Sequence, residues 1–269
     1  MKTSVPARGE RAPAVLVIAG SDPSGGAGMQ GDLATLAAVG AFGMAVPTAL
    51  TVQSRRGVRR AQALPPAAIE AGIRAVLTRQ PVDAIKIGML HDAAVASAVA
   101  RALARFRGSI VIDPVLRPTR GRPLARGDLV GALLRALIPR AAVVTPNLEE
   151  ASALCRHPVR DIELMLAAGC ALCEIGAACA LVKGGHLAGD AIDVVVDARG
   201  CALIWGARRR SPRTHGTGCA LSTLIAAGLA RGLGGRDACL EARRRLDRAL
   251  RGDHPVGRGS GSVAHRALR

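Results

Sequence analysis

A glycine-rich segment near the C-terminus leads directly into an apolar repeat. Its sequence is THGTGCALSTLIAAGLARG, residues 214–232, in which leucine and isoleucine recur at helical spacing after Cys219. Unpaired N–H groups at the start of a helix, together with the helix dipole, favour anions. Cys219 lies where the turn becomes the helix, a position that lowers the pKa of a thiol. The segment therefore predicts a phosphate site beside a reactive thiol.

Polar residues also follow several apolar stretches. Lys183 is followed by two glycines in a chain with only three lysines, which favours a compact ammonium near phosphate over a surface role. Asn147 and Glu150 have the spacing of a helix capping box, and a magnesium-linked role for Glu150 is the alternative. Asp113 precedes Pro114, where either an Asx turn or a ligand contact fits.

The N-terminal third contains a second glycine-rich loop. Residues 26–31, GAGMQG, match the dinucleotide fingerprint, but no Asp or Glu lies between Asp32 and Glu70 to bind a ribose, so a nicotinamide site is disfavoured. No GKS or GKT follows either loop, which excludes a Walker-type site. Asp32 and Gln53 would face a small polar molecule if their elements project into one cleft. Otherwise they are a helix-surface carboxylate and a strand-end amide.

These residues require a framework of alternating strands and helices. Apolar runs predict strands at 14–20, 43–53, 83–90, 108–115, 141–147 and 178–185, and a hairpin of 191–197 with 201–206. Periodic segments predict helices after the first loop, from Pro65, over 93–105, around 129–137, before 178, from Cys219 and from Arg236. Pro47 indicates an edge or a bulge in the second strand. Such alternation predicts a mostly parallel sheet with ligands at the carboxyl ends of its strands.

Composition narrows the class of protein. The chain has 269 residues, 49% of them hydrophobic and only 1% aromatic, which suits parallel strands covered by helices on both faces. Neither a linker nor a repeat is evident, so we expect one domain over 1–269, with polar residues 1–12 flexible. No apolar run is long enough for a membrane span, and the N-terminus lacks a signal core, so we expect a cytoplasmic protein.

Charge and cysteine content are the two unusual features. The net charge of +17 comes almost entirely from arginines spread along the chain, and aromatic platforms for bases are nearly absent, so nucleic-acid binding is disfavoured. Seven cysteines, mostly within apolar segments, indicate buried thiols in a reducing compartment. Cys170 and Cys173 form a CxxC without a second ligand pair, which favours an interior helix face over a metal site.

The motifs as an ordered set resemble those of the hydroxymethylpyrimidine/phosphomethylpyrimidine kinases of the ribokinase-like superfamily. They are AGSDPSGGAGMQGDLATLAAVGAFGMAVPTALTVQ, KIGML, VIDPVL, VVTPNLEEASAL, ALVKGGH, THGTGCALSTLIAAGLARG and the tail VGRGSGSVAH. The resemblance covers almost the whole chain. It implies a three-layer α/β/α sandwich, usually a homodimer. It also implies an enzyme that uses ATP and Mg²⁺ to phosphorylate 4-amino-5-hydroxymethyl-2-methylpyrimidine and then its monophosphate.

The resemblance also implies roles for particular residues. The pyrimidine pocket would be lined by Gly20, Asp32, Gln53, Met89 and Val115. Asp113, Asn147 and Glu150 would serve ATP and magnesium, with Glu150 acting through water, and Lys183 would lie near the transferred phosphate. The anion hole would comprise Gly216, Thr217, Gly218 and Cys219, with Cys219 as general base toward the substrate hydroxyl.

Some positions depart from the family pattern. Arg117 and Arg120 replace small residues after Val115, which leaves open whether residues 117–122 form a lid. Arg213 stands before the anion hole where a polar residue is common. In the tail, Ser260 and Ser262 replace a His and a Pro, whereas His265 is kept. Two alternatives therefore stay open: a pyridoxal kinase of the same superfamily, and a catalytically silent pyrimidine-binding regulatory protein.

Overall fold

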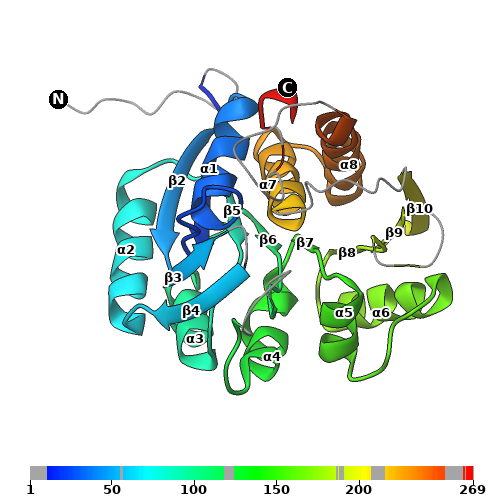
Figure 1. Cartoon of the computed structure of the whole chain (residues 1–269), viewed down its shortest axis with the longest axis horizontal. Coiled ribbons are helices and arrows are strands. Elements are labelled where there is room, and N and C mark those ends of the chain that lie inside the picture. The colour runs from blue at the N-terminus through cyan, green and yellow to red at the C-terminus, as the bar shows by residue number, and fades with distance from the viewer. Residues whose placement is uncertain are drawn as a thin grey trace.

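A central sheet of eight strands runs through the protein (Figure 1). This computed structural model describes residues 11–54, 57–117, 124–185, 187, 191–206, 216–251, 263 and 265–268. The strand order is β10-β9-β8-β7-β6-β5-β1-β2. Neighbouring strands from β2 to β8 are parallel, and β9 is antiparallel to both of its neighbours, β8 and β10. The strands are β1 Ala14–Ala19, β2 Phe42–Pro47, β5 Ala84–Ile87, β6 Ser109–Ile112, β7 Val143–Val144, β8 Cys179–Val182, β9 Ala191–Asp197 and β10 Gly200–Gly206.

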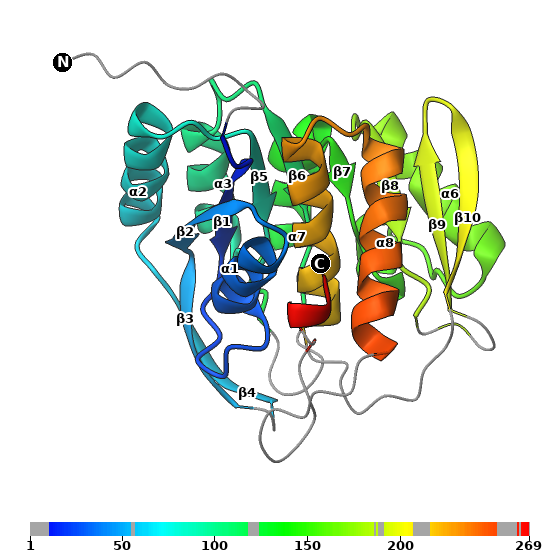
Figure 2. The same cartoon turned by 90° about the horizontal axis from the view of Figure 1, so that it is seen from above.

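Helices cover both faces of this sheet, as Figures 1 and 2 show from two directions. One face carries α1 Gly28–Ala38, α7 Thr217–Ala230, α8 Gly235–Arg251 and the short 3-10 helix His265–Leu268. The other carries α2 Pro66–Arg79, α3 Ala93–Ala102, α4 Leu129–Ala132 with the turns Leu133–Leu137 and Ile138–Arg140, α5 Leu148–Cys155 and α6 Ile162–Glu174. The predicted three-layer α/β/α sandwich is therefore confirmed. Within the described ranges, no helix is long and apolar enough to cross a bilayer.

Strand β1 shows how the sequence produces two cores. All six of its residues are buried, because helices lie on both sides of the sheet. Val15 and Val17 pack toward α1 and α7, whereas Leu16 and Ile18 pack toward α2 and α3. Each fully buried side chain of this size stabilises the fold by about 1.5–3 kcal/mol. Aliphatic strands can fill both cores without aromatic residues.

The strand predicted over residues 43–53 is in fact two strands. It breaks at Thr48, because β2 ends at Pro47 on the edge of the sheet and β3 (Ala49–Ser54) leaves the sheet to pair with β4 (Gly57–Ala63). The Thr48 hydroxyl donates to the Met89 carbonyl at 2.5 Å and fixes this departure. A separate two-stranded ribbon results, and β4 was missed because its sequence, GVRRAQA, is polar and alternates poorly.

Other predictions have mixed outcomes. The hairpin of β9 and β10 is confirmed, whereas the helical segment before β8 is two helices, α5 and α6. All seven cysteines are free thiols: Cys179 and Cys239 are buried, Cys155, Cys173 and Cys219 are partly buried, and Cys170 and Cys201 are exposed, so the expectation of buried thiols holds only in part. Arg11, in the segment expected to be flexible, is anchored by Asp83 at 2.8 Å. Residues 1–10 lie outside the described part.

Candidate active site

The start of α7 presents backbone N–H groups toward the carboxyl edge of the sheet. Gly216 caps this helix in the left-handed region at φ +81°, which an L side chain rarely adopts. A Cβ at this position would also lie 1.8 Å from the Gly26 carbonyl oxygen, so the two glycine-rich loops meet here. Among the described residues, no side chain caps α7. The predicted anion hole of Gly216, Thr217 and Gly218 therefore has a suitable geometry, while Thr214 and His215 lie outside the described ranges.

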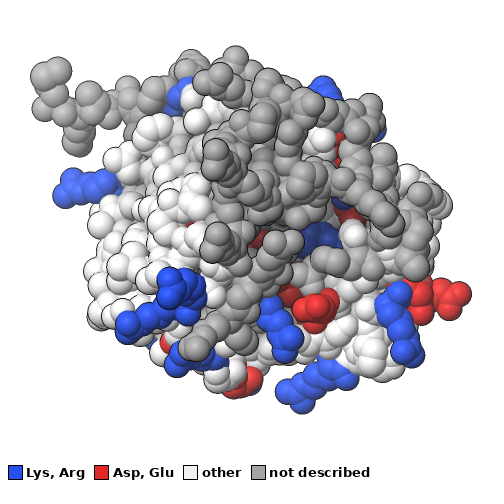
Figure 3. Space-filling view, in the orientation of Figure 1, with Lys and Arg blue, Asp and Glu red and all other residues white. Residues whose placement is uncertain are grey.

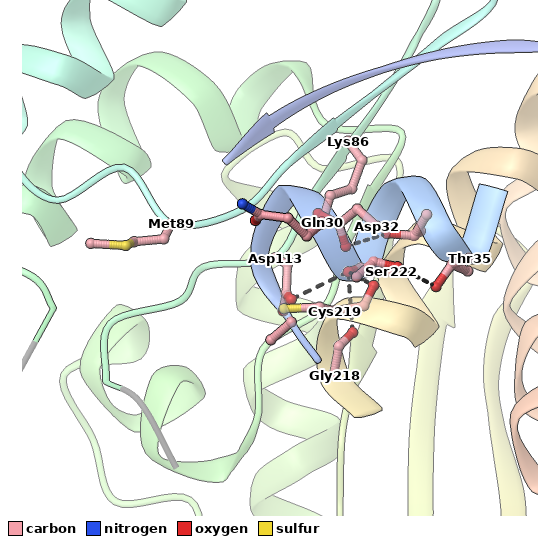
Figure 4. A network of polar contacts seen from close by, with 12 residues as sticks. Gln30, Asp32, Thr35, Lys86, Met89, Asp113, Gly218, Cys219 and Ser222 are labelled. Carbon is pink, nitrogen blue, oxygen red and sulfur yellow. Dashed lines mark hydrogen bonds and ion pairs between the residues drawn. The ribbon is translucent and has the colours of Figure 1, made fainter. Parts of the chain in front are cut away.

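Lys183 connects this helix start to Asp113. Its Nζ lies 2.9 Å from Asp113 Oδ1 and 3.3 Å from the position that a Cβ on Gly218 would take. The Ser222 hydroxyl, on the first turns of α7, lies 3.2 Å from Asp113 Oδ2 and also within hydrogen-bond distance of the Gly218 and Cys219 carbonyls of its own helix. Thr145 donates to Oδ1 at 3.2 Å. Figure 4 shows Asp113, Ser222 and Cys219 gathered at the start of the helix. The structure thus brings together residues more than a hundred positions apart.

The Asp113 carboxylate and the Lys183 ammonium both stay charged in this cluster. Burial alone would raise the pKa of Asp113, but the charges of Lys183 and Lys86 outweigh it and lower that pKa. Burial likewise opposes the charge of Lys183, and the carboxylates of Asp113 and Glu150 reverse this and raise its pKa. Asp113 is therefore an anion and Lys183 a cation at neutral pH. The Asx turn considered for Asp113 is not its role, because its carboxylate oxygens bind Lys183, Thr145 and Ser222.

Asn147 and Glu150 form the capping box of α5. The Asn147 side chain accepts from the Glu150 N–H at 2.9 Å, and the Glu150 carboxylate accepts from the Asn147 N–H at 2.9 Å. Lys183 lies beside this box, since its N–H donates to the Pro146 carbonyl at 2.8 Å. Burial, assisted by the charge of Asp113 and opposed by Lys183, raises the pKa of Glu150 to about 7. Glu150 therefore has a structural role and a carboxylate that is sensitive to nearby cations.

Cys219 does not have the depressed pKa that its position at a helix start suggested. Burial raises the pKa of the thiol to about 11; Lys86 opposes this shift and Asp32 adds to it. At pH 7, only about one molecule in 10⁴ carries the thiolate. The expectation of a poised thiolate is therefore wrong for this structure, because desolvation outweighs the favourable effect of Lys86.

Gly20, Met89 and Val115 lie close together beneath the β3–β4 ribbon. A Cβ on Gly20 would lie 2.7 Å from Met89 Sδ, so these two residues are in direct contact. Met89 packs with Ala49 and Val58 of the β3–β4 ribbon, and Val115 lies against the same cluster. Gln53 follows a bulge in β3 and is half-buried. Three of the five residues expected to line an acceptor pocket thus converge beneath the ribbon, and Gln53 belongs to the ribbon itself.

Asp32 differs from the other four, because its side chain has no exposed surface. Its Oδ2 accepts from Lys86 Nζ at 2.7 Å, and its Oδ1 accepts from the Thr223 hydroxyl at 2.7 Å. Figure 4 shows Lys86 and Asp32 above Ser222 and Cys219, with Met89 well to one side. The structure corrects the expectation that Asp32 lines the pocket, since both of its oxygens are engaged beneath it.

Sequence reasoning missed three residues of this site. Ser222 and Thr223 stand three and four positions after Cys219, so the helical period could have placed them on the same face. Lys86 was visible as a lysine inside an otherwise apolar strand. Of the departures from the family pattern, Arg117 is exposed, while Arg120, Arg213, Ser260 and Ser262 lie outside the described ranges; His265, which is kept, is half-buried.

Comparisons with known proteins identify the family of the chain. The family model described as phosphomethylpyrimidine kinase matches residues 22–264. The hydroxymethylpyrimidine/phosphomethylpyrimidine kinase of Streptomyces coelicolor is 40% identical over 253 residues, covering 94% of this chain and 94% of that protein. The thiamine biosynthesis bifunctional protein ThiED of Geobacter sulfurreducens is 41% identical over 93% of this chain, which spans 52% of that longer protein.

Solved structures show the same fold. A phosphomethylpyrimidine kinase from Clostridium difficile superposes with a TM-score of 0.76 at 33% identity, covering 86% of this chain and 96% of that one. The pyridoxal kinase of Bacillus subtilis, in an ADP complex, has a TM-score of 0.86 at 30% identity, covering 96% of this chain and 98% of that one. The sequence match and the shared architecture together show that the chain belongs to the phosphomethylpyrimidine kinase family, a family of ribokinase-like kinases.

Proposed function

We propose that this protein transfers the γ-phosphoryl group of ATP to 4-amino-5-hydroxymethyl-2-methylpyrimidine and then to its monophosphate, as a cytoplasmic enzyme of thiamine biosynthesis. The observation that carries the proposal is the position of Lys183, whose ammonium lies between the Asp113 carboxylate and the start of α7. The names of the relatives supply the pyrimidine and the pathway.

Charge stabilisation at α7 is the main catalytic contribution of the chain. The Lys183 ammonium lies beside the start of α7, 3.3 Å from the position of a Cβ on Gly218, which supports a role for both in binding the negative charge of a transferred phosphoryl group. Donors of this kind contribute about 10²–10³-fold in rate each. Phosphoryl transfer depends mainly on positioning and charge stabilisation, so a protonated Cys219 is compatible with turnover. The thiol then acts as a proton acceptor only through its minor thiolate form.

Magnesium fits the carboxylates beside Lys183. Asp113 and Glu150 supply hard oxygen donors, and the Glu150 carboxylate keeps acceptor capacity beyond its bonds to the Asn147 and Leu116 N–H groups. No group of three metal-binding side chains occurs within the described residues. We therefore assign Glu150 a contact through a hydration water. When bound, Mg²⁺ supplies neutralisation of phosphate charge.

The acceptor would bind against Met89 and Val115, beneath the β3–β4 ribbon. Met89 and Val115 offer apolar contacts to a pyrimidine ring, and the Gln53 amide has both a donor and an acceptor for an aminopyrimidine edge. Gly20 leaves room for Met89. The hydroxymethyl group would then point from this wall toward Lys183 and Cys219.

Pyridoxal is the second candidate acceptor, because pyridoxal kinases are among the most similar structures. Wild-type protein with ATP and Mg²⁺ should convert the pyrimidine to its mono- and diphosphate, identified by mass. A kcat/KM for pyridoxal at or above that for the pyrimidine would transfer the assignment to pyridoxal. Turnover of neither, with the pyrimidine still bound, would favour the silent regulatory protein.

We also propose a homodimer. The outer side of the β3–β4 ribbon exposes Leu50 at 55% and Val52 at 56%, which supports a second copy as its partner. Leu50→Lys should convert a dimer to a monomer in light scattering, and a monomeric wild type would contradict this. We also propose that nucleic acid is not a partner, because the chain is only 1% aromatic and so offers almost no platforms for stacking bases, although basic side chains are prominent on the face in Figure 3.

A further inference from the structure

A fully buried ion pair lies beneath the two halves of the site. Lys86 on β5 and Asp32 on α1 both have no exposed side-chain surface, and their atoms Nζ and Oδ2 are 2.7 Å apart. Burial disfavours the ammonium, but Asp32 outweighs it and raises the pKa of Lys86. A charged pair without solvent contact is costly unless further hydrogen bonds complete it. Here Thr223 completes it from a third element.

Thr223 connects this pair to α7. Its hydroxyl donates to Asp32 Oδ1 at 2.7 Å, and its side chain is fully buried. Thr223 follows Cys219 by four positions, so the two residues lie on the same face of the helix, one turn apart. Its neighbour Ser222 lies 3.2 Å from Asp113 Oδ2, but its single hydroxyl proton also faces the Gly218 and Cys219 carbonyls of its own helix at 3.1 and 3.0 Å. Thr223 is therefore the hydroxyl of this part of α7 whose printed bond goes to a carboxylate on another element.

The same ion pair also reaches the acceptor wall. A Cβ on Gly88 would lie 2.9 Å from Lys86 Nζ, so the ammonium sits directly under the residue that precedes Met89. Lys86, Asp32 and Thr223 therefore form a continuous path from the pocket wall to the start of α7. The path crosses β5, α1 and α7, which are distant in sequence.

We propose that Thr223, acting through Asp32 and Lys86, is a positioning residue that holds the anion hole of α7 in register with the acceptor wall at Gly88–Met89. The expected loss of kcat rests on the proposed kinase function, whereas the expected change in hydrogen exchange rests on the contacts alone. A hydroxyl that serves only packing would be replaceable by a methyl group. One that positions the helix would not.

The test replaces Thr223 by Val, which keeps the shape and removes the hydroxyl, and by Ser, which keeps the hydroxyl. Thr35→Val is the matched control, because Thr35 is also fully buried and donates only to the Gly31 carbonyl of its own helix, at 2.8 Å. Steady-state kinetics would be measured for both substrates. Amide hydrogen exchange would be followed by mass spectrometry over residues 220–227, a readout that needs no turnover.

Thr223→Val should lower kcat about 5–20-fold with the KM values for ATP and acceptor changed less than about twofold, consistent with the loss of one hydrogen bond to a charged group. Exchange at the start of α7 should accelerate about tenfold. Thr223→Ser should restore most of the rate, and Thr35→Val should change neither quantity. Unchanged exchange in Thr223→Val, or faster exchange with unchanged kcat, would overturn the inference. A wild type without kinase activity would refute the proposed function instead, and the exchange comparison would then decide the inference by itself.

Discussion

Replacing Lys183 by Met tests whether its ammonium stabilises the transferred charge. The ammonium is 2.9 Å from Asp113 and beside the start of α7, so the variant removes a preorganised donor without removing the backbone N–H groups. Loss of such a donor costs about 10²–10³-fold in kcat, or about 2.7–4 kcal/mol of transition-state stabilisation. We expect a loss of this size in kcat, with the KM for the acceptor changed less than about threefold.

Stability must be separated from catalysis in this experiment. Breaking a fully buried ion pair costs about 3–5 kcal/mol. Lys183 is 14% exposed and Asp113 keeps its bonds to Ser222 and Thr145, so we expect about 1–3 kcal/mol here. Arg11→Met is the matched control, because it breaks a partly buried pair with Asp83 at the other end of β1.

Initial rates with saturating ATP and Mg²⁺, together with urea unfolding, measure both quantities. The control should lose stability by a similar amount and keep its kcat. A Lys183→Met enzyme within threefold of the wild-type kcat would refute the reasoning, because the ammonium would then contribute only to the fold.

Three further predictions concern the rest of the site. The rate of alkylation of Cys219 by iodoacetamide in the ligand-free protein should rise with pH with a midpoint near pH 11, and a midpoint below pH 8 would restore the poised thiolate. Cys219→Ala should lower kcat by no more than about 10²-fold, which is the low end for loss of a general base. The pKa of Glu150 in the folded protein, about 7, lies above its unfolded value, so the folded state binds more protons between these two pKa values. As the pH rises from about 4.5 to 7, the free energy of unfolding of the wild type should therefore fall relative to that of Glu150→Gln. The same pH dependence for both proteins in urea unfolding would contradict this. Gly20→Ala should displace Met89 and raise the KM for the acceptor several-fold while the KM for ATP stays unchanged, whereas the control Gly72→Ala in α2 should alter neither KM. An unchanged KM for the acceptor in Gly20→Ala would argue against Met89 as a wall of the pocket.

Local patterns in the sequence were sufficient for the fold and for part of the site. Apolar runs located the buried strands, and the glycines before Cys219 located the start of α7. The spacing of Asn147 and Glu150 predicted the capping box. Each of these features depends on residues that are close in sequence, where period and turn chemistry act directly.

The rest depended on long-range contacts. The pKa of Cys219 is set by burial and by the charges of Lys86, Asp32 and Asp113, which no local motif encodes. Asp32 was expected in the pocket because of the family resemblance, yet its carboxylate is fully buried and accepts from Lys86 and Thr223. The ribbon of β3 and β4 escaped prediction because a two-stranded antiparallel pair outside the main sheet needs little apolar periodicity.

The acceptor assay is the most direct test of the central claim. Purified protein would be incubated with ATP, Mg²⁺ and either 4-amino-5-hydroxymethyl-2-methylpyrimidine or its monophosphate. The products would be identified by mass spectrometry. We expect the monophosphate and then the diphosphate, with a kcat/KM for the pyrimidine above that for pyridoxal. Absence of phosphorylated product from both pyrimidines, in protein shown to be folded, would contradict it.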